Sequence, residues 1–255
     1  IIIMRRKLIA GNWKMNNTNK EALELVKQLK DLVKDVKDRD IMIAPTFTCL
    51  SDVNNAIKGS NIKLGAQNLY FEEKGAFTGQ ISADMLLNVG CEYVIVGHSE
   101  CRDIFGEKDE LINKKVKRAL DKNLVPVLCV GEHLEEREKG ITSDIVSSQV
   151  KEAFKGLSEA EAKKVVIAYE PVWAIGTGKT ATPQDADDVH KTIRDTLKSI
   201  YNDGVAEGMI ILYGGSVNEK NADDLLNMPN IDGALVGGAS LVADKFARIV
   251  NYIAK

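Results

Sequence analysis

The segment VVIAYEPVWAIGTGKTA, residues 165–181, joins a strand-like run to a glycine-rich loop. Its first three residues are β-branched, which favours a buried strand, and Pro171 lacks the backbone donor that would continue that strand. One carboxylate, Glu170, stands between the run and Pro171. The loop then carries bulky Trp173 and Ile175, followed by glycines. This composition predicts a lid over Glu170, and partial desolvation under a lid would raise the pKa of that carboxylate and strengthen it as a base.

The same arrangement recurs along the whole chain: a short apolar run, a polar or glycine-rich turn, and a helical stretch. The runs are almost continuously apolar, which is typical of parallel strands covered on both faces. They comprise Leu8–Trp13, Ile41–Ala44, Ile62–Ala66, Tyr93–Gly97, Val125–Val130, Val165–Tyr169, Met209–Tyr213 and Ala234–Val236.

Helix signals lie between these runs. Ser158 with Glu161 fits a capping box, and Thr182 followed by Pro183 places a cap before a proline at the first helical position. Apolar residues at helical spacing predict a buried face near the N-terminus. That face is Leu23, Val26, Leu29, Leu32 and Val33.

Eight strand–helix units in 255 residues predict an α/β protein with the (β/α)8 barrel fold, in which eight parallel strands are surrounded by helices. We expect one domain over residues 4–255, with residues 1–3 as an upstream extension. The alternative is an open doubly wound sheet, which usually carries a glycine-rich turn after its first strand. Gly11–Asn16 lacks that pattern, and the glycines near Gly178 follow a long loop rather than a strand, so nucleotide-binding motifs are not favoured.

Composition excludes several classes of protein. The chain is 44% hydrophobic with a formal net charge of −3, and it has no basic stripe that would bind nucleic acid. No apolar run reaches the roughly 18–20 residues that a membrane span needs. The four cysteines show no C-x-x-C spacing, which predicts no disulfide, no zinc site and a reducing cytoplasm.

Polar residues and glycines follow most of the runs, where the strands of a barrel converge on one mouth. Glu170 is the candidate base, and His98, Lys14 and Asn12 are candidate hydrogen-bond donors to an oxyanion. The glycines after the last two runs, with a short helix beyond Gly238, match the recurrent phosphate site of this architecture. His133 and His190 lie in or beside helical stretches, where solvated or capping roles are expected.

These motifs together resemble the triosephosphate isomerase family over essentially the whole chain from Met4 onward. The segments that carry the resemblance are Gly11–Asn16, Gly65–Asn68, Gly75–Gly79, Gly97–Glu100, Tyr169–Ala181, Tyr213–Val217 and Gly237–Leu241. The resemblance implies a TIM barrel that interconverts dihydroxyacetone phosphate and glyceraldehyde 3-phosphate without a cofactor or metal.

By the same resemblance, Glu170 moves the proton between neighbouring carbons and neutral His98 polarises the carbonyl. Lys14 and Asn12 stabilise the enediolate. Glu100 supports these groups, and Ser99 holds Glu170 when the site is open. Backbone N–H groups hold the phosphate, and they belong to Gly176, Ser216, Gly237 and Gly238.

The resemblance also implies a homodimer in which the Phe71–Gln80 loop docks into a second subunit, with Thr78 near the neighbouring active site. Phe77, a large apolar residue in a polar loop, favours this interpretation over an ordinary surface loop. The family commonly has Arg where Cys101 stands and Glu where Gln80 stands, so an interface ion pair is absent here.

Two alternatives stay open at this stage. A sugar-phosphate aldolase on the same fold would use a Schiff-base lysine that is desolvated inside the barrel. A non-catalytic binder of phosphorylated metabolites would keep the glycines but would not need Glu170.

Overall fold

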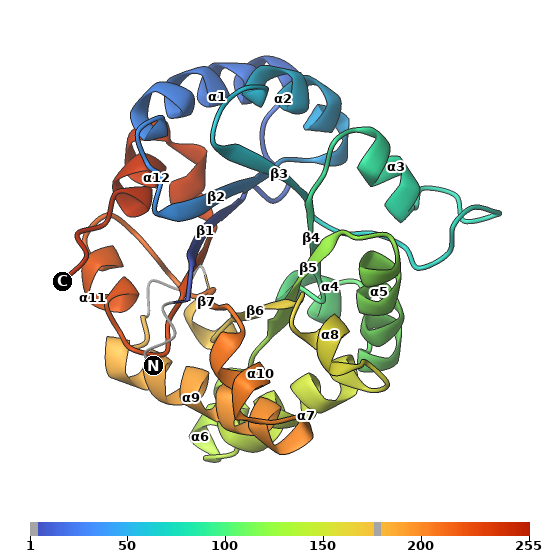
Figure 1. Ribbon diagram of the computed structural model, residues 1–255, viewed down its shortest axis with the longest axis vertical. Coiled ribbons are helices and arrows are strands. Elements are labelled where there is room, and N and C mark those ends of the chain that lie inside the picture. The colour runs from blue at the N-terminus through green and yellow to red at the C-terminus, as the bar shows by residue number, and fades with distance from the viewer. Residues whose placement is uncertain (1–4, 176–179) are drawn as a thin grey trace.

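The computed structural model describes residues 5–175 and 180–255. Within them, eight parallel strands pair in chain order and close into a barrel, because β1 pairs with both β2 and β8 (Figure 1). The predicted fold class is confirmed. The strands are β1 (Lys7–Asn12), β2 (Arg39–Ala44), β3 (Ile62–Ala66), β4 (Tyr93–Val96), β5 (Val125–Val130), β6 (Val166–Tyr169), β7 (Ile211–Tyr213) and β8 (Gly233–Val236).

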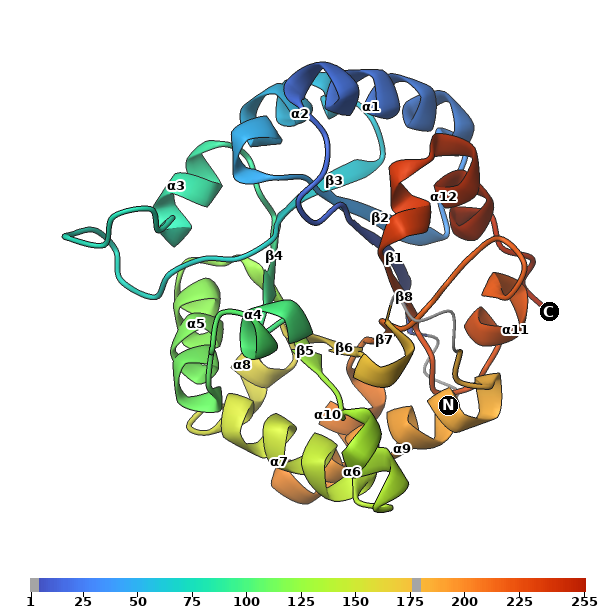
Figure 2. The same ribbon diagram turned by 180° about the vertical axis from the view of Figure 1, so that it is seen from behind.

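Helices surround the barrel on its outside (Figures 1 and 2). The α-helices are α1 (Asn19–Val33), α2 (Leu50–Ile57), α3 (Ala83–Asn88), α4 (Ser99–Asp103), α5 (Asp109–Asp121), α6 (Leu134–Glu138), α7 (Thr142–Phe154), α8 (Glu159–Ala162), α9 (Pro183–Ile200), α10 (Asp203–Gly208), α11 (Ala222–Leu226) and α12 (Ala243–Val250). The described residues also form short 3-10 helices, namely η1 (Phe47–Cys49), η2 (Val172–Ala174) and η3 (Gly238–Leu241). No helix in the described ranges is long and apolar enough to cross a membrane.

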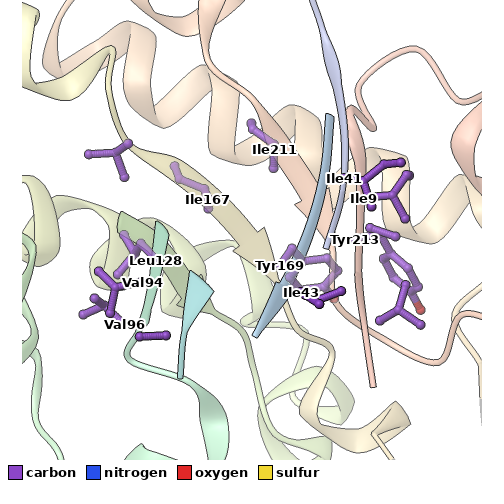
Figure 3. Close-up of a cluster of buried hydrophobic side chains, with 14 of the residues drawn as sticks. Ile9, Ile41, Ile43, Val94, Val96, Leu128, Ile167, Tyr169, Ile211 and Tyr213 are labelled. Carbon is purple, nitrogen blue, oxygen red and sulfur yellow. The ribbon is translucent and has the colours of Figure 1, made fainter. Parts of the chain in front are cut away.

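Each strand buries both of its faces, as the apolar runs predict, because successive side chains point to opposite sides of the sheet. One set fills the barrel interior, for example Leu8, Ala10 and Met42. The other set packs between strands and helices, and Figure 3 shows part of this layer. It includes Ile9, Ile41, Ile43, Val94, Val96, Leu128, Ile167, Tyr169, Ile211 and Tyr213.

The predicted helix caps are present. Ser158 caps α8 and Thr182 caps α9, each with a reciprocal bond from the acidic residue three positions later. The face predicted for α1 is partly wrong, because Leu23 and Leu32 are 38% and 43% exposed. These two lie at the flanks of the buried stripe, which consists of Ala22, Leu25, Val26, Leu29 and Val33.

The loop between β3 and α3 extends away from the barrel, and both views show it as the most protruding segment (Figures 1 and 2). It contains the predicted Phe71–Gln80 excursion. Phe77 in this loop is 38% exposed, and its ring lies 4.8 Å from that of Tyr70.

Candidate active site

On each strand, every second side chain points into the barrel, and this alternation continues past the strand ends into the candidate site. Val166 and Ala168 point into the barrel interior, and two residues later the same row reaches Glu170. The row on β1 leads in the same way to Asn12, and that on β8 leads to Gly237. The pleat of the strands therefore directs these residues to the C-terminal mouth of the barrel, where catalytic groups of this fold gather.

A cavity of about 360 Å³ lies at this mouth. It brings together most of the residues that the sequence predicts for the site: Asn12, Lys14, His98, Glu170, Ser216, Gly237 and Gly238. Ser99 and Glu100 adjoin it through bonds to Glu170, His98 and Lys14. Gly176 lies outside the described residues, as does the central part of the predicted lid.

Glu170 and His98 form a buried hydrogen-bonded pair. Nε2 of His98 lies 2.7 Å from Oε1 of Glu170, and the N–H of Ser99 donates to Oε2 of Glu170 at 3.0 Å. Nδ1 of His98 accepts a bond of 3.2 Å from the N–H of Glu100 at the start of α4. Because Nδ1 is an acceptor, the hydrogen-bond network assigns the ring proton to Nε2, which donates to Glu170.

The electrostatics of this pair differ from the sequence expectation. Burial by itself raises the pKa of Glu170, but His98, the Ser99 N–H and Lys14 together hold that pKa below its ordinary value. The expected upward shift is therefore not found in this conformation. Burial lowers the pKa of His98, but Glu170 and Glu100 outweigh it and raise that pKa above 6.5. A substrate that separated the pair would remove the His98 contact, which is the largest of the contributions that lower the pKa of Glu170.

Lys14 is held in an uncommon backbone conformation, with φ at +54°. A left-handed conformation costs a non-glycine residue about 1–2 kcal/mol. The N–H of Lys14 donates to Oδ1 of Asn12 at 3.0 Å, which supports that geometry. The ammonium lies 2.9 Å from Oε1 of Glu100. This pairing orients the cation at the edge of the cavity.

Glycines make room for Glu170 on two sides. A Cβ at Gly131 would lie 1.7 Å from the carbonyl oxygen of Glu170, and one at Gly214 would lie 2.9 Å from Cγ of Glu170. Neither position therefore tolerates a side chain without a shift of its neighbours.

Another part of the cavity wall suits an anion. β8 ends at Val236, and η3 starts at Gly238, so the predicted short helix is present. The backbone around Gly237 lines the cavity beside the Lys14 side chain, since a Cβ at Gly237 would lie 3.6 Å from Cε of Lys14. Backbone N–H groups next to an ammonium form a site of the kind that binds phosphate.

The described start of the lid segment is anchored from beneath. Nε1 of Trp173, in η2, donates to Oε1 of Glu132 at 3.0 Å, and the Tyr169 hydroxyl donates to the same oxygen at 3.0 Å. Glu132 is fully buried. Sequence reasoning did not single it out, although a carboxylate directly after Gly131 at the end of β5 is a signal of the type used for the other strands.

The other two histidines have separate roles. His133 is the exposed N-cap of α6, as predicted. The expectation for His190 is wrong, because its side chain is fully buried in α9 and its ring lies 5.9 Å from that of Tyr169. The cavity is also lined by Asn218, Glu219 and Lys245, which sequence reasoning missed. Lys245 lies on α12, and no motif marks it.

The chain matches the family described as "Triosephosphate isomerase" over residues 7–253. The chain belongs to the triosephosphate isomerase family. The triosephosphate isomerase of Caldanaerobacter subterraneus subsp. tengcongensis is 56% identical over 249 residues, which cover 98% of this chain and 100% of the relative. That of Fusobacterium nucleatum is 54% identical over 97% of this chain and 99% of the relative. The triosephosphate isomerase of Acetivibrio thermocellus is 56% identical over 98% and 99%, respectively.

Proposed function

We propose that the protein interconverts dihydroxyacetone phosphate and glyceraldehyde 3-phosphate by proton transfer through an enediolate. The observation that carries this proposal is the Glu170–His98 pair in the wall of a cavity that also offers Lys14 and the Gly237 backbone to an anion. Membership of the triosephosphate isomerase family agrees with it. A three-carbon phosphate would lie with its phosphate on the glycines and its carbonyl between the base and the donors.

In this proposal, Glu170 removes the proton next to the carbonyl and returns it to the neighbouring carbon. Such a proton is weakly acidic, so the developing oxyanion must be stabilised at the same time. His98 donates from Nε2 to one oxygen and then to the other, and Lys14 and Asn12 stabilise the negative charge. A positioned acid–base group contributes about 10²–10⁴-fold to the rate.

The phosphate is assigned to backbone N–H groups of Ser216, Gly237 and Gly238, with Gly176 as the fourth donor. Ser99 and Glu100 are assigned supporting roles. The N–H of Ser99 holds the Glu170 carboxylate, and Glu100 orients both His98 and Lys14. No cofactor or metal enters the proposed reaction.

The aldolase alternative is less well supported. A Schiff-base lysine needs a desolvated amine, whereas the Lys14 side chain is 28% exposed and pairs with Glu100. The other lysine of the described cavity wall, Lys245, is exposed. A non-catalytic binder would have no need of the buried Glu170–His98 pair.

We further propose a homodimer formed through the Phe71–Gln80 loop, with Thr78 directed at the partner's active site. Apolar side chains support it, since Phe105 lines a cavity together with Phe77 and Thr78 and is 76% exposed, and its chain neighbour Ile104 is 70% exposed. Large exposed apolar patches mark interaction surfaces. Burial and the nearby Glu107 raise the pKa of the Cys101 thiol to about 11, so this residue is a poor nucleophile at neutral pH.

A reducing cytoplasm is the proposed location. The four cysteines, all in the described part of the chain, carry free thiols. Disulfides are rare in that compartment.

A coupled isomerase assay on both triose phosphates tests the activity, with the same reaction in heavy water as a second readout. We expect turnover and incorporation of solvent deuterium next to the carbonyl. Borohydride added with substrate tests the aldolase alternative, because it would trap a Schiff base on a lysine as a stable adduct. A covalent adduct on Lys14, or the absence of both turnover and deuterium exchange, would refute the proposal.

A further inference from the structure

We propose that a second cavity, behind Glu170, is the route by which the proton removed from the substrate exchanges with solvent while substrate occupies the first cavity. This inference rests on the proposed function. Its basis is that Glu170 contributes to the walls of both cavities. A substrate in the first cavity would stand between the carboxylate and the mouth of the barrel, so exchange needs another path.

The second cavity has a volume of about 170 Å³. Its inner end is formed by buried residues, namely Ser99, Cys129 and Glu170. Ser99 is also the residue whose N–H binds Oε2 of Glu170, so this oxygen lies beside the second cavity. The volume is sufficient for several water molecules, which need polar partners to occupy such a space.

Polar side chains provide those partners along the cavity. Arg102 donates to Oδ1 of Asp109 at 2.6 Å and to the carbonyl of Cys129 at 3.0 Å. Oε1 of Gln149 accepts from the N–H of Gly131 at 2.7 Å. All these side chains line the cavity. A chain of water molecules between them could therefore carry a proton away from Glu170.

The outer end of the cavity reaches the protein surface. The exposed residues of its wall are Lys108, Asp103 and His133, and the side chains of the last two are 39% and 50% exposed. They are joined by a contact of 3.0 Å between Nε2 of His133 and the Asp103 carboxylate. This pair forms one side of the entrance through which solvent would reach the inner residues.

The exchange replaces one proton on Glu170 by one deuteron from solvent. After removal from carbon, the proton is bound to a Glu170 oxygen as a carboxylic acid. In heavy water, that O–H bond breaks and the proton passes to a water molecule in the second cavity, while an O–D bond forms with a deuteron from the same water chain. The enediolate then receives deuterium instead of the original proton. Exchange thus competes with direct transfer, and their ratio is measurable in the product.

The test compares the wild-type protein with two variants in heavy water, using NMR to measure how much product retains the substrate's own proton. Asp103→Leu combined with His133→Phe makes the entrance apolar. Cys129→Ala widens the inner end. In the double variant, we expect the ratio of exchange to direct transfer to fall about ten-fold, equivalent to a barrier to exchange raised by about 1.4 kcal/mol. In Cys129→Ala, we expect this ratio to rise. The kcat/KM of the double variant, whose substitutions are remote from Glu170, should stay within about two-fold of wild type, a free-energy change of well under 1 kcal/mol.

Glu135→Phe is the matched control, because Glu135 is an exposed residue of α6 and is not among the residues that line the cavity. It should leave the ratio unchanged. An unchanged ratio in the sealed double variant and in Cys129→Ala, with isomerisation intact, would overturn the inference alone. Absence of isomerisation in the wild-type protein would instead overturn the proposed function.

Discussion

Nε2 of His98 and Oε1 of Glu170 lie 2.7 Å apart, although their residues follow β4 and β6 and are 72 positions apart in the chain. Both side chains are almost fully buried. A hydrogen bond between an imidazole and a carboxylate in such surroundings couples their proton affinities. Glu170, the proposed base, is thus hydrogen-bonded to His98, the proposed donor, and a substrate that binds to both must replace that contact.

Replacing Glu170 by Gln should lower the pKa of His98. In the wild-type protein the Glu170 charge helps to raise this pKa against the effect of burial, and Gln removes the charge but retains a similar shape. NMR titration of the imidazole in the unliganded protein measures the change. A pKa that stays the same or rises in the variant would show that Glu170 is not what raises it.

His190 should make stability fall as the solution becomes acidic. Burial lowers its pKa to about 3, from 6.5 for an unperturbed histidine. Above pH 6.5 the residue is neutral in both states and its contribution is fully present. Below that, the unfolded chain binds a proton that the folded protein does not, which costs about 1.4 kcal/mol per pH unit.

Urea unfolding at pH 6.0 and 5.0 measures this effect. His190→Phe is the control, since it cannot be protonated and should show a shallower loss of stability by about 1.4 kcal/mol over that unit. Equal slopes in the two proteins would mean that His190 is accessible to protons in the folded state.

Gly131→Ala should destabilise the protein by about 1–3 kcal/mol or more, the usual cost of overpacking. The added Cβ would lie 1.7 Å from the Glu170 carbonyl oxygen, and backbone must move to relieve this contact. Gly208→Ala is the matched control, because nothing lies within 4 Å of its added Cβ. Chemical denaturation compares the two, and a similar small effect from both would show that the turn after β5 is not tightly constrained.

Phe77→Asp should weaken the proposed dimer, because it places a charge on an apolar residue of the protruding loop. Sedimentation at several protein concentrations would detect the shift toward monomer. Val242→Asp is a suitable control, since Val242 is also exposed, at 46%, but lies before α12. If both variants sediment like the wild-type protein, the loop is not the interface.

The strands were predictable because a strand of a parallel barrel is buried on both faces, so it is a continuous apolar run in the sequence. Two of them, Ile62–Ala66 and Val125–Val130, match β3 and β5 residue for residue. Strand ends locate Glu170 and Asn12 because the period of two continues from the barrel interior into the mouth. The start of α9 was also predictable, because the N-cap Thr182 and the following Pro183 are neighbours in the sequence.

Features that depend on distant contacts were not predictable. The net pKa shift of Glu170 reflects its contact with His98, which burial alone could not reveal. The left-handed backbone of Lys14 carries no glycine to signal it. Lys245, on α12, lines the cavity although it stands seven residues beyond the Gly237–Gly238 motif, and no strand end marks it. The flanks of α1 depend on where neighbouring helices pack, so Leu23 and Leu32 could not be assigned from spacing.

The most direct measurement of the central claim is the initial rate of triose phosphate interconversion by Glu170→Gln. The variant keeps the size of the side chain but removes the base. We predict that kcat falls by about 10²–10⁴-fold, with thermal unfolding and phosphate binding close to wild type. A folded Glu170→Gln protein that turns over substrate at the wild-type rate would contradict the account.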